Sequence, residues 1–240
     1  MEVAAVISAA GSSTRMGGVK KEYRTLGTDD EGEPLTVLGA AVAAFAAIPR
    51  ISLIVIAVPP RAEDGEFAAR KSLPARLLVS DARPRILFVP GGSTRRLSVH
   101  HALALLAAYQ PDYVLIHDGA RPWVSGDLID RIIDAALVHK AVIPLLPLIE
   151  TPKEIDENSF VSRHLKRARV GTAQTPQAFA FPQILAAHDK AAERELREHI
   201  DYTDDAEVWG AFVGSVAVIP GAPENRKITF PEDLLSNNRH

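Results

Sequence analysis

Short apolar runs rich in β-branched residues recur along the whole chain. They cover Val3–Ser8, Ile51–Val58, Ile86–Val89, Tyr113–His117, Val142–Leu148 and Val216–Ile219. Most of these runs are nearly continuous rather than alternating, which is typical of strands that are covered on both faces, as in a parallel sheet. We therefore predict that they form one mostly parallel sheet.

The stretches between these runs carry the periodicity of amphipathic helices. In 37–48 the residues Leu38, Val42 and Phe45 fall on one face. Further helices are expected over 94–109, 126–139, 182–198 and 203–211. Strands that alternate with helices predict an α/β fold with a Rossmann-like, doubly wound sheet. In such sheets, ligands bind beyond the carboxyl ends of the strands.

Two segments interrupt this alternation. Residues 28–34 are acidic and rich in turn formers, so we predict an exposed loop there. Residues 149–168 are polar, and a turn at 156–159 separates two short extended pieces. A polar hairpin that leaves a compact sheet buries little surface by itself, so it is either flexible or packs on another subunit. We expect a single domain over 1–240 with this β-arm at about 149–168.

Composition limits the classes of function. The 240 residues fit one large α/β domain, and the net charge of −3 gives no general affinity for nucleic acid or an anionic membrane. With no cysteine, the chain has no disulfide, cysteine-based zinc site or thiol nucleophile. Glu2 stands where a signal peptide needs positive charge, and the apolar runs are too short to span a bilayer. We expect a cytoplasmic protein.

A loop of small residues, Ala9–Gly17, follows the first predicted strand directly. Small side chains let the backbone approach a phosphate, and successive N–H groups form an anion-binding nest. Arg15, Lys20 and Lys21 add cations, as a triphosphate requires. Ser13 replaces the second glycine of the dinucleotide fingerprint, and no Gly-Lys-Ser/Thr follows as in a P-loop. By itself, the loop fits a phosphate site and an ordinary strand-to-helix turn equally well.

The run 113–122 delivers an acid, Asp118, to the carboxyl end of an apolar strand. A carboxylate in that place can hold Mg²⁺ against phosphate oxygens, and Arg121 can grip a second anion. The alternative is that Asp118 caps the turn and pairs with Arg121. His117 fits a buried strand residue better than a metal ligand, because no second ligand stands at chelating spacing.

A second glycine loop, 91–99, follows another predicted strand. Ser93 or Thr94 can cap the next helix, which would place Ser98 near the mouth of the sheet. Considered alone, this loop is better explained as a plain strand–loop–helix junction. The remaining polar candidates lie in the second half of the chain and gain meaning only in combination: Thr151, Lys153, Arg167, 175–177, 203–205 and Lys227.

Taken in order, these motifs resemble the 2-C-methyl-D-erythritol 4-phosphate cytidylyltransferase family. The resemblance runs from about 3 to 234 and rests on AAGSSTRMGGVKKEY, GGSTRRLSV, VLIHDGARP, ETPK, KRARVGTAQTPQAF, TDDA and NRKITFPEDL. The opening loop is shared with many sugar nucleotidyltransferases, whereas HDGARP and TPQAF together are much more specific. An oxidoreductase is disfavoured because the second strand ends in Val58–Pro60 without the acid that a dinucleotide site needs.

The resemblance implies a nucleotidyltransferase that joins CTP to 2-C-methyl-D-erythritol 4-phosphate. The products are the CDP-polyol and pyrophosphate, in non-mevalonate isoprenoid biosynthesis. It also implies Mg²⁺ as cofactor and a homodimer whose β-arm reaches across to the partner. The same chemistry on another polyol phosphate, such as ribitol 5-phosphate, remains an alternative.

Roles transfer residue by residue from the resemblance. The catalytic cations would be Arg15, Lys21 and Lys227, where Lys21 rather than Lys20 is chosen on the Lys-Glu-Tyr match. The nucleotide would be lined by Ala9, Ala10, Gly11, Gly92 and Ser98. The polyol phosphate would be bound by Asp118, Arg121, Thr151, Arg167, Thr175 and Thr203, with Asp118 also holding the metal. Thr151 and Arg167 would come from the neighbouring subunit. The chain departs from the family at Lys20, often proline, and at Ser93, often an acid.

Overall fold

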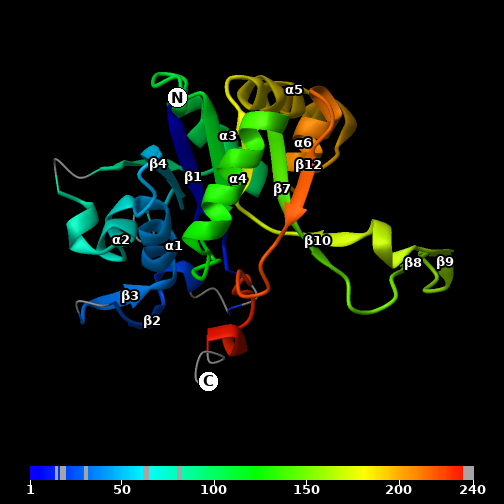
Figure 1. Ribbon diagram of the computed structural model, residues 1–240, viewed down its shortest axis with the longest axis horizontal. Helices are drawn as coiled ribbons and strands as arrows, with labels where there is room; N and C mark the ends of the chain where they lie inside the picture. Colours follow the sequence, from blue (N-terminus) through cyan, green and yellow to red (C-terminus); the bar gives the residue numbers. More distant parts are fainter. Residues whose placement is uncertain (14–15, 17–19, 30–31, 62–64, 80–82, 235–240) are drawn as a thin grey trace.

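The computed structural model describes residues 1–13, 16, 20–29, 32–61, 65–79 and 83–234. Within these residues, the central sheet has eight strands in the order β10-β7-β11-β6-β1-β4-β5, with β12 beside β7 (Figure 1). The strands are β1 (Val3–Ser8), β4 (Ile51–Val58), β5 (Arg85–Pro90), β6 (Tyr113–Asp118), β7 (Ala141–Pro147), β10 (Gly171–Ala173), β11 (Gln177–Ala180) and β12 (Ala217–Pro220).

The sheet is mostly parallel, as the sequence predicted. β1 pairs in parallel with β4 and β6, β4 with β5, and β12 with β7. β11 is antiparallel to both β6 and β7, and β10 is antiparallel to β7. The sequence analysis did not predict β10 and β11, because they are short and lie in the polar stretch around Thr175-Pro176.

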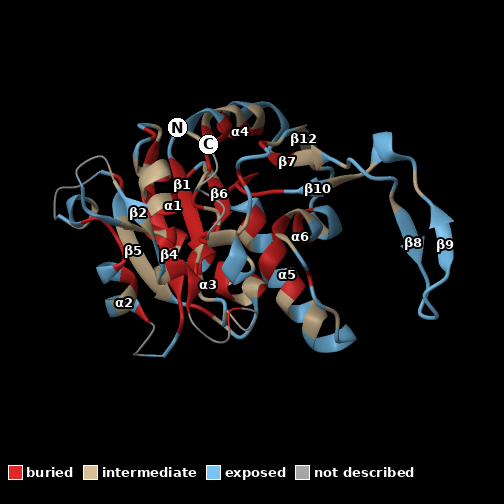
Figure 2. Ribbon diagram, turned by 90° about the horizontal axis from the view of Figure 1, so that it is seen from below, coloured by how far each residue is buried: buried red, intermediate tan, exposed pale blue. Residues whose placement is uncertain are grey.

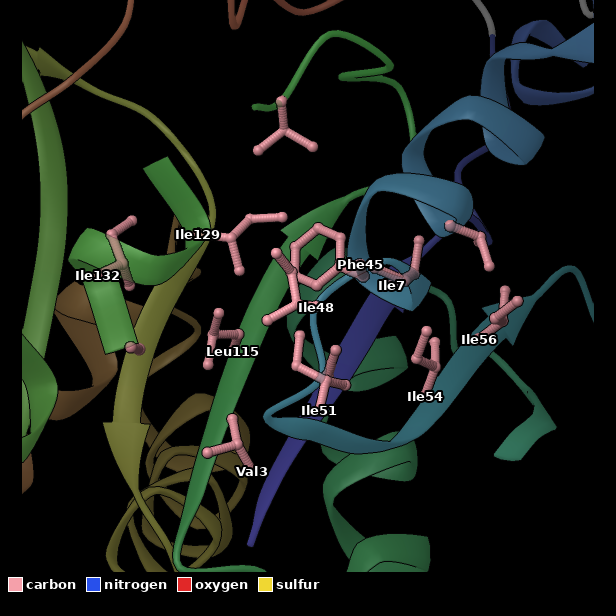
Figure 3. Packing of buried hydrophobic residues seen from close by; sticks show 14 of the residues in the cluster. Val3, Ile7, Phe45, Ile48, Ile51, Ile54, Ile56, Leu115, Ile129 and Ile132 are labelled. Carbon is pink, nitrogen blue, oxygen red and sulfur yellow. The ribbon is translucent and has the colours of Figure 1, made fainter. Parts of the chain in front are cut away.

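Helices cover both faces of the sheet. One face packs against α1 (Val37–Ala46) and α4 (Gly126–His139), and the other against α3 (Arg95–Leu106), α5 (Gln183–Glu198) and α6 (Asp205–Phe212). Figure 3 shows the first layer, where Phe45, Ile129 and Ile132 lie against apolar side chains of β1, β4 and β6. No described helix is long and apolar enough to cross a membrane.

Side-chain caps fix where the helices begin. Thr94 Oγ1 accepts a hydrogen bond from Leu97 N, and Ser125 Oγ accepts one from Leu128 N. Such caps satisfy backbone donors that have no partner inside the helix. Thr94, rather than Ser93, therefore caps the helix after the second glycine loop. At the end of α4, Lys140 adopts φ 66° and closes the helix.

Smaller elements complete the chain. β2 (Thr25–Thr28) and β3 (Pro34–Thr36) form an antiparallel hairpin. The predicted exposed loop 28–34 begins and ends in these strands, its residues 32–34 are exposed, and 30–31 lie outside the described residues. A short helix, α2 (Glu66–Lys71), follows β4. Short 3-10 helices cover Lys21–Tyr23, Ala75–Leu77, Arg167–Arg169 and Pro231–Leu234. The sequence analysis did not predict the β2–β3 hairpin, α2 or the 3-10 helices, because these elements are too short to show a periodic pattern.

The predicted hairpin in 149–168 is present. β8 (Lys153–Ile155) and β9 (Val161–His164) pair antiparallel, and the Asp156 carboxylate accepts hydrogen bonds from Asn158 N and Phe160 N in the turn. Both views show the hairpin extending away from the body, and its strands are exposed on both sides (Figures 1 and 2). It therefore buries little surface against its own chain.

The two glycine loops pack against each other at Gly91. A Cβ at this position would overlap the Ala10 Cβ and would lie 2.8 Å from Ser98 Oγ and 3.2 Å from Val58 O. Two of these neighbours are held by the sheet and the helix, so they have little freedom to move. Gly91 thus allows the loops after β1 and β5 to approach closely.

We expect Gly91→Ala to lower the free energy of unfolding by about 1–3 kcal/mol, because the added methyl group overpacks this junction. Gly11→Ala is the control, since no atom lies within 4 Å of the Cβ that it would add. Its effect should stay within about 0.5 kcal/mol. Urea denaturation of both variants measures the difference, and equal stabilities would contradict the close packing at Gly91.

Candidate active site

A cavity of about 400 Å³ opens at the carboxyl ends of β1 and β6, between the two glycine loops. This is where a doubly wound sheet is expected to bind its ligand. The wall combines small residues, charged residues and a segment near the carboxyl terminus. It is formed by Ser8, Ala10, Gly11, Ser12, Ser13, Met16, Lys21, Glu22, Gly92, Ser93, Thr94, Arg95, Ser98, Asp118, Ala120, Lys227 and Thr229.

Asp118 is surrounded by cations at this mouth. Its Oδ1 accepts a hydrogen bond from Arg95 Nε at 3.0 Å, and its Oδ2 lies 2.9 Å from Lys227 Nζ and 3.6 Å from Arg121 Nε. Burial alone would raise the pKa of this carboxyl, but Arg95, Lys227 and Arg121 hold it well below its usual range. Asp118 is therefore ionised at neutral pH.

Lys20 and Lys21 point to different partners. Lys21 Nζ donates to Ile228 O at 2.9 Å and lines the cavity, so it joins the first loop to the segment that carries Lys227. Lys20 Nζ donates to Gly11 O and lies 3.4 Å from Glu22 Oε2. Lys20 does not line the cavity. This geometry favours Lys21 as the lysine that can reach a ligand.

The small residues of the two loops have distinct positions. Ala10, Gly11, Gly92 and Ser98 line the cavity, whereas Ala9 is fully buried behind it. Ser98 Oγ accepts from Gly92 N at 3.0 Å and donates to Thr94 O at 2.8 Å, which fixes the second loop. Arg15, the remaining predicted cation, lies outside the described residues.

A buried hydrogen-bond chain supports Asp118 from below. Thr175 Oγ1 accepts from Asp118 N at 3.0 Å and lies 3.1 Å from His117 Nδ1, while His117 Nε2 lies 3.1 Å from Arg121 O. Because a carbonyl only accepts, His117 carries its proton on Nε2 and its Nδ1 accepts from the Thr175 hydroxyl. Burial lowers the pKa of His117 to about 4, so the ring is neutral. His117 is a buried strand residue, as predicted.

Arg121 and Thr175 are thus held by the protein itself. Arg121 Nη1 donates to Asn225 O at 2.8 Å, and the Thr175 hydroxyl has both of its partners in the chain below the cavity. Thr203 also lies outside the cavity wall, and its hydroxyl contacts Glu207 Oε2 at 2.9 Å. These three residues do not line the cavity, whereas Asp118, Lys21 and Lys227 do.

Thr151 and Arg167 belong to the arm and do not line this cavity. Both are exposed, and Arg167 Nη1 donates to Ile149 O at 2.6 Å. The arm lies away from the body in both views (Figures 1 and 2). Within one chain, therefore, these two residues are not brought together with Asp118.

The sequence analysis missed two charged residues of the cavity. Arg95 bridges Asp118 and the buried Asp205, with its Nη1 at 2.8 Å from Asp205 Oδ2. Glu22 also lines the cavity, and its Oε2 accepts from Ser13 Oγ at 3.2 Å. One signal for Arg95 was available, because it directly follows the helix cap Thr94 and must therefore lie near the mouth of the loop.

The cavity fits a Mg²⁺ ion that arrives with phosphate. Among the described residues there is no group of three His, Cys, Asp or Glu side chains that could hold a metal alone. In nucleotide sites, however, Mg²⁺ takes one or two carboxylates and completes its shell with substrate phosphates and water. Asp118 and Glu22 supply carboxylates of this kind in the cavity wall.

Comparison with known proteins finds relatives of this chain among curated proteins. A protein named bifunctional enzyme IspD/IspF from Rhodospirillum rubrum is 43% identical over 234 residues, which are 97% of this chain and 55% of that protein. A protein of the same name from Bartonella henselae is 37% identical over 237 residues, 98% of this chain and 55% of that protein. The chain thus spans about half the length of the curated relatives that it matches.

Solved structures agree with the fold. The 4-diphosphocytidyl-2C-methyl-D-erythritol synthase of Anaerococcus prevotii superposes with a TM-score of 0.77 at 29% identity and covers 98% of this chain and 95% of its own. The 2-C-methyl-D-erythritol 4-phosphate cytidylyltransferase of Thermus thermophilus gives 0.69 at 30% identity, covering 98% and 96%. The predicted Rossmann-like α/β fold is confirmed.

The family described as 2-C-methyl-D-erythritol 4-phosphate cytidylyltransferase has a model that matches residues 3–239. This match covers both glycine loops, the β6 acid, the arm and the segment with Lys227. The chain therefore belongs to the 2-C-methyl-D-erythritol 4-phosphate cytidylyltransferase family.

Proposed function

We propose that this chain transfers the cytidylyl group of CTP to 2-C-methyl-D-erythritol 4-phosphate, giving the CDP-polyol and pyrophosphate for isoprenoid biosynthesis. The observation that carries the proposal is the convergence of Lys21, Lys227 and Asp118 on one cavity between two glycine loops. Backbone donors, cations and one ionised acid are the groups that a nucleoside triphosphate requires. Family membership supports the choice of base and acceptor.

The reaction is an in-line attack of the acceptor phosphate oxygen on the α-phosphorus of CTP. A phosphate monoester is already anionic near neutral pH, so no strong base is needed, and no covalent enzyme intermediate forms. The difficulty is to bring two anions together and to stabilise the charge of the transition state. Lys21 and Lys227 neutralise this charge from opposite ends of the chain, and Arg15 is proposed as the third cation.

Mg²⁺ would be held by Asp118, with Glu22 as the second carboxylate of the cavity wall. When bound, it neutralises charge on the phosphates of CTP. Lys227 lies 2.9 Å from Asp118 Oδ2, so the same acid orients a cation that faces the phosphates. The low pKa of Asp118 keeps both interactions available at neutral pH.

The cytosine base is proposed to be recognised by the backbone of the two small-residue loops. Ala10, Gly11, Gly92 and Ser98 line the cavity, and Ala9 closes the first loop from behind. Backbone donors and acceptors can complement the edge of cytosine, and the two loops approach each other closely at Gly91. We propose that the small cleft between them disfavours a purine. We expect CTP to be used much better than ATP.

The acceptor is proposed to bind on the Arg121 side of Asp118, near Thr175 and Thr203. Thr151 and Arg167 would be supplied by the arm of a second copy, because they do not line the cavity of their own chain and the arm extends away from the body (Figure 1). The arm exposes several large apolar side chains, which suits an intermolecular contact. These are Ile149, Ile155, Phe160 and Val161. We propose a cytoplasmic homodimer of single-domain chains over 1–240.

The direct test of the proposed function is pyrophosphate release from CTP and Mg²⁺ with a panel of polyol phosphates. We expect turnover with 2-C-methyl-D-erythritol 4-phosphate and little with ribitol 5-phosphate. Replacing CTP by ATP should abolish most of the product. Equal turnover of both acceptors would indicate instead a cytidylyltransferase that acts on polyol phosphates more broadly. Equal use of ATP and CTP would contradict the proposed recognition of cytosine.

We expect Lys21→Ala and Lys227→Ala each to lower kcat by about 10²–10³, because each removes a preorganised cation from the charge of the transition state. Steady-state kinetics of pyrophosphate release measures the loss. Lys190→Ala, on the exposed side of α5, is the matched control and should leave kcat unchanged. Wild-type turnover in either cavity variant would remove that lysine from the proposed mechanism.

We expect the double substitution Ile155→Ser and Phe160→Ser to weaken self-association, because it removes two exposed apolar side chains from the arm. Sedimentation velocity over a range of protein concentrations measures the monomer–dimer balance. Leu196→Ser is the control, since Leu196 is even more exposed than Ile155 and Phe160 but lies on α5. A dimer of unchanged affinity in the arm variant would show that the contact lies elsewhere.

A further inference from the structure

Arg95 joins the acid of the cavity to a second acid that no ligand can reach. Its Nε donates to Asp118 Oδ1 at 3.0 Å, and its Nη1 donates to Asp205 Oδ2 at 2.8 Å. Asp118 ends β6, Arg95 begins α3 and Asp205 begins α6. A single planar guanidinium therefore fixes three elements to one another, and its fork geometry makes the arrangement directional.

His188 approaches Asp205 from a second side. The Asp205 Oδ1 atom lies 3.3 Å from His188 Nε2, and both side chains are fully buried. Burial raises the pKa of a carboxyl, but Arg95 and His188 bring that of Asp205 below its ordinary value. Asp205 is therefore a buried, ionised carboxylate whose position is fixed by the residues around it.

The neighbouring acid has a different task. Asp204 caps α6, because its Oδ1 accepts from Glu207 N at 2.9 Å, and its Oδ2 accepts from Gln177 Nε2 at 3.0 Å. Its role as the N-cap of α6 therefore accounts for Asp204. Asp205 does not cap this helix, and its partners are Arg95 and His188. The two adjacent acids form a natural pair for comparison.

Burying an ionised carboxylate costs free energy that an apolar core residue would not. The ion pair with Arg95 offsets this free-energy cost. Arg95 in turn lines the cavity and contacts Asp118, so the buried carboxylate is linked to the candidate active site. Without Asp205, the guanidinium would lose its second anchor and could turn around its bond to Asp118. The positive charge of Arg95 would then lack its second anionic partner while it still lies beside Asp118, the acid that is proposed to hold Mg²⁺.

We propose that Asp205 is a positioning residue that acts through Arg95 to hold the Asp118 carboxylate in its working orientation. This inference rests on the proposed function for its effect on turnover, but not for its geometry. His188 Nε2 lies 3.3 Å from the other oxygen of Asp205. The carboxylate of Asp118 is thereby set by Arg95 on one oxygen and by Lys227 on the other.

The test compares wild type with Asp205→Asn, Asp204→Asn, Arg95→Gln and the double variant Arg95→Gln/Asp205→Asn. Asparagine keeps the size of the side chain, and at position 204 it still caps the helix. We expect Asp205→Asn to lower kcat about 10–100-fold, as outer partners of site residues do, with KM for CTP little changed. Asp204→Asn should leave kcat close to wild type.

The double variant separates positioning from a merely structural role. If Asp205 acts through Arg95, its substitution has no further effect on kcat once Arg95 is glutamine. Losses that multiply in the double variant would overturn the proposal, and so would equal kcat values for Asp205→Asn and Asp204→Asn. An inactive wild type would refute the proposed function instead.

A second measurement does not depend on activity. The Nε–H group of Arg95 is assigned in a ¹H–¹⁵N spectrum by its absence in Arg95→Gln. We expect this signal to shift or broaden in Asp205→Asn, because the guanidinium loses an anchor, and to stay unchanged in Asp204→Asn. An unchanged signal in Asp205→Asn would overturn the positioning role, whatever the kinetics show.

Discussion

The negative charge of Asp118 holds together the cluster of cations at the carboxyl end of β6. One carboxylate at the end of β6 meets Arg95 of α3, Lys227 of the carboxyl-terminal segment and Arg121 of the following turn. Without the acid, three cations would face one another in a poorly hydrated place, and their repulsion would open the cavity. With it, the cations keep fixed positions and still outnumber the acid that they surround.

The sheet decides where this cluster can form. β1, β5 and β6 run parallel, so the loops that follow them meet at one edge. The antiparallel strand β11 lies beside β6, and the loop just before it places Thr175 under the backbone of Asp118. A strand that runs against both β6 and β7 thus leads Thr175 to the carboxyl end of β6.

Sequence reasoning succeeded where the pattern is local and long, as in the buried strand 51–58 and the helix 126–139. It missed β10 and β11, because three or four residues around a Thr-Pro step show no period. The resemblance chose Lys21 over Lys20, and the structure adds how the contacts of the two lysines differ. The two are adjacent in sequence, but the short 3-10 helix that begins at Lys21 directs one to Gly11 O and the other to Ile228 O.

By itself, the sequence determined the longer strands and helices, the small-residue loops and the acid at a strand end, because each follows from periodicity or from neighbours in the chain. Only the tertiary structure decided which charges meet. Lys21 and Ile228 are 207 positions apart, and Arg95 and Asp205 are 110 apart. A contact between such distant segments leaves no local signal, because it depends on how the sheet orders its strands and not on the residues beside it.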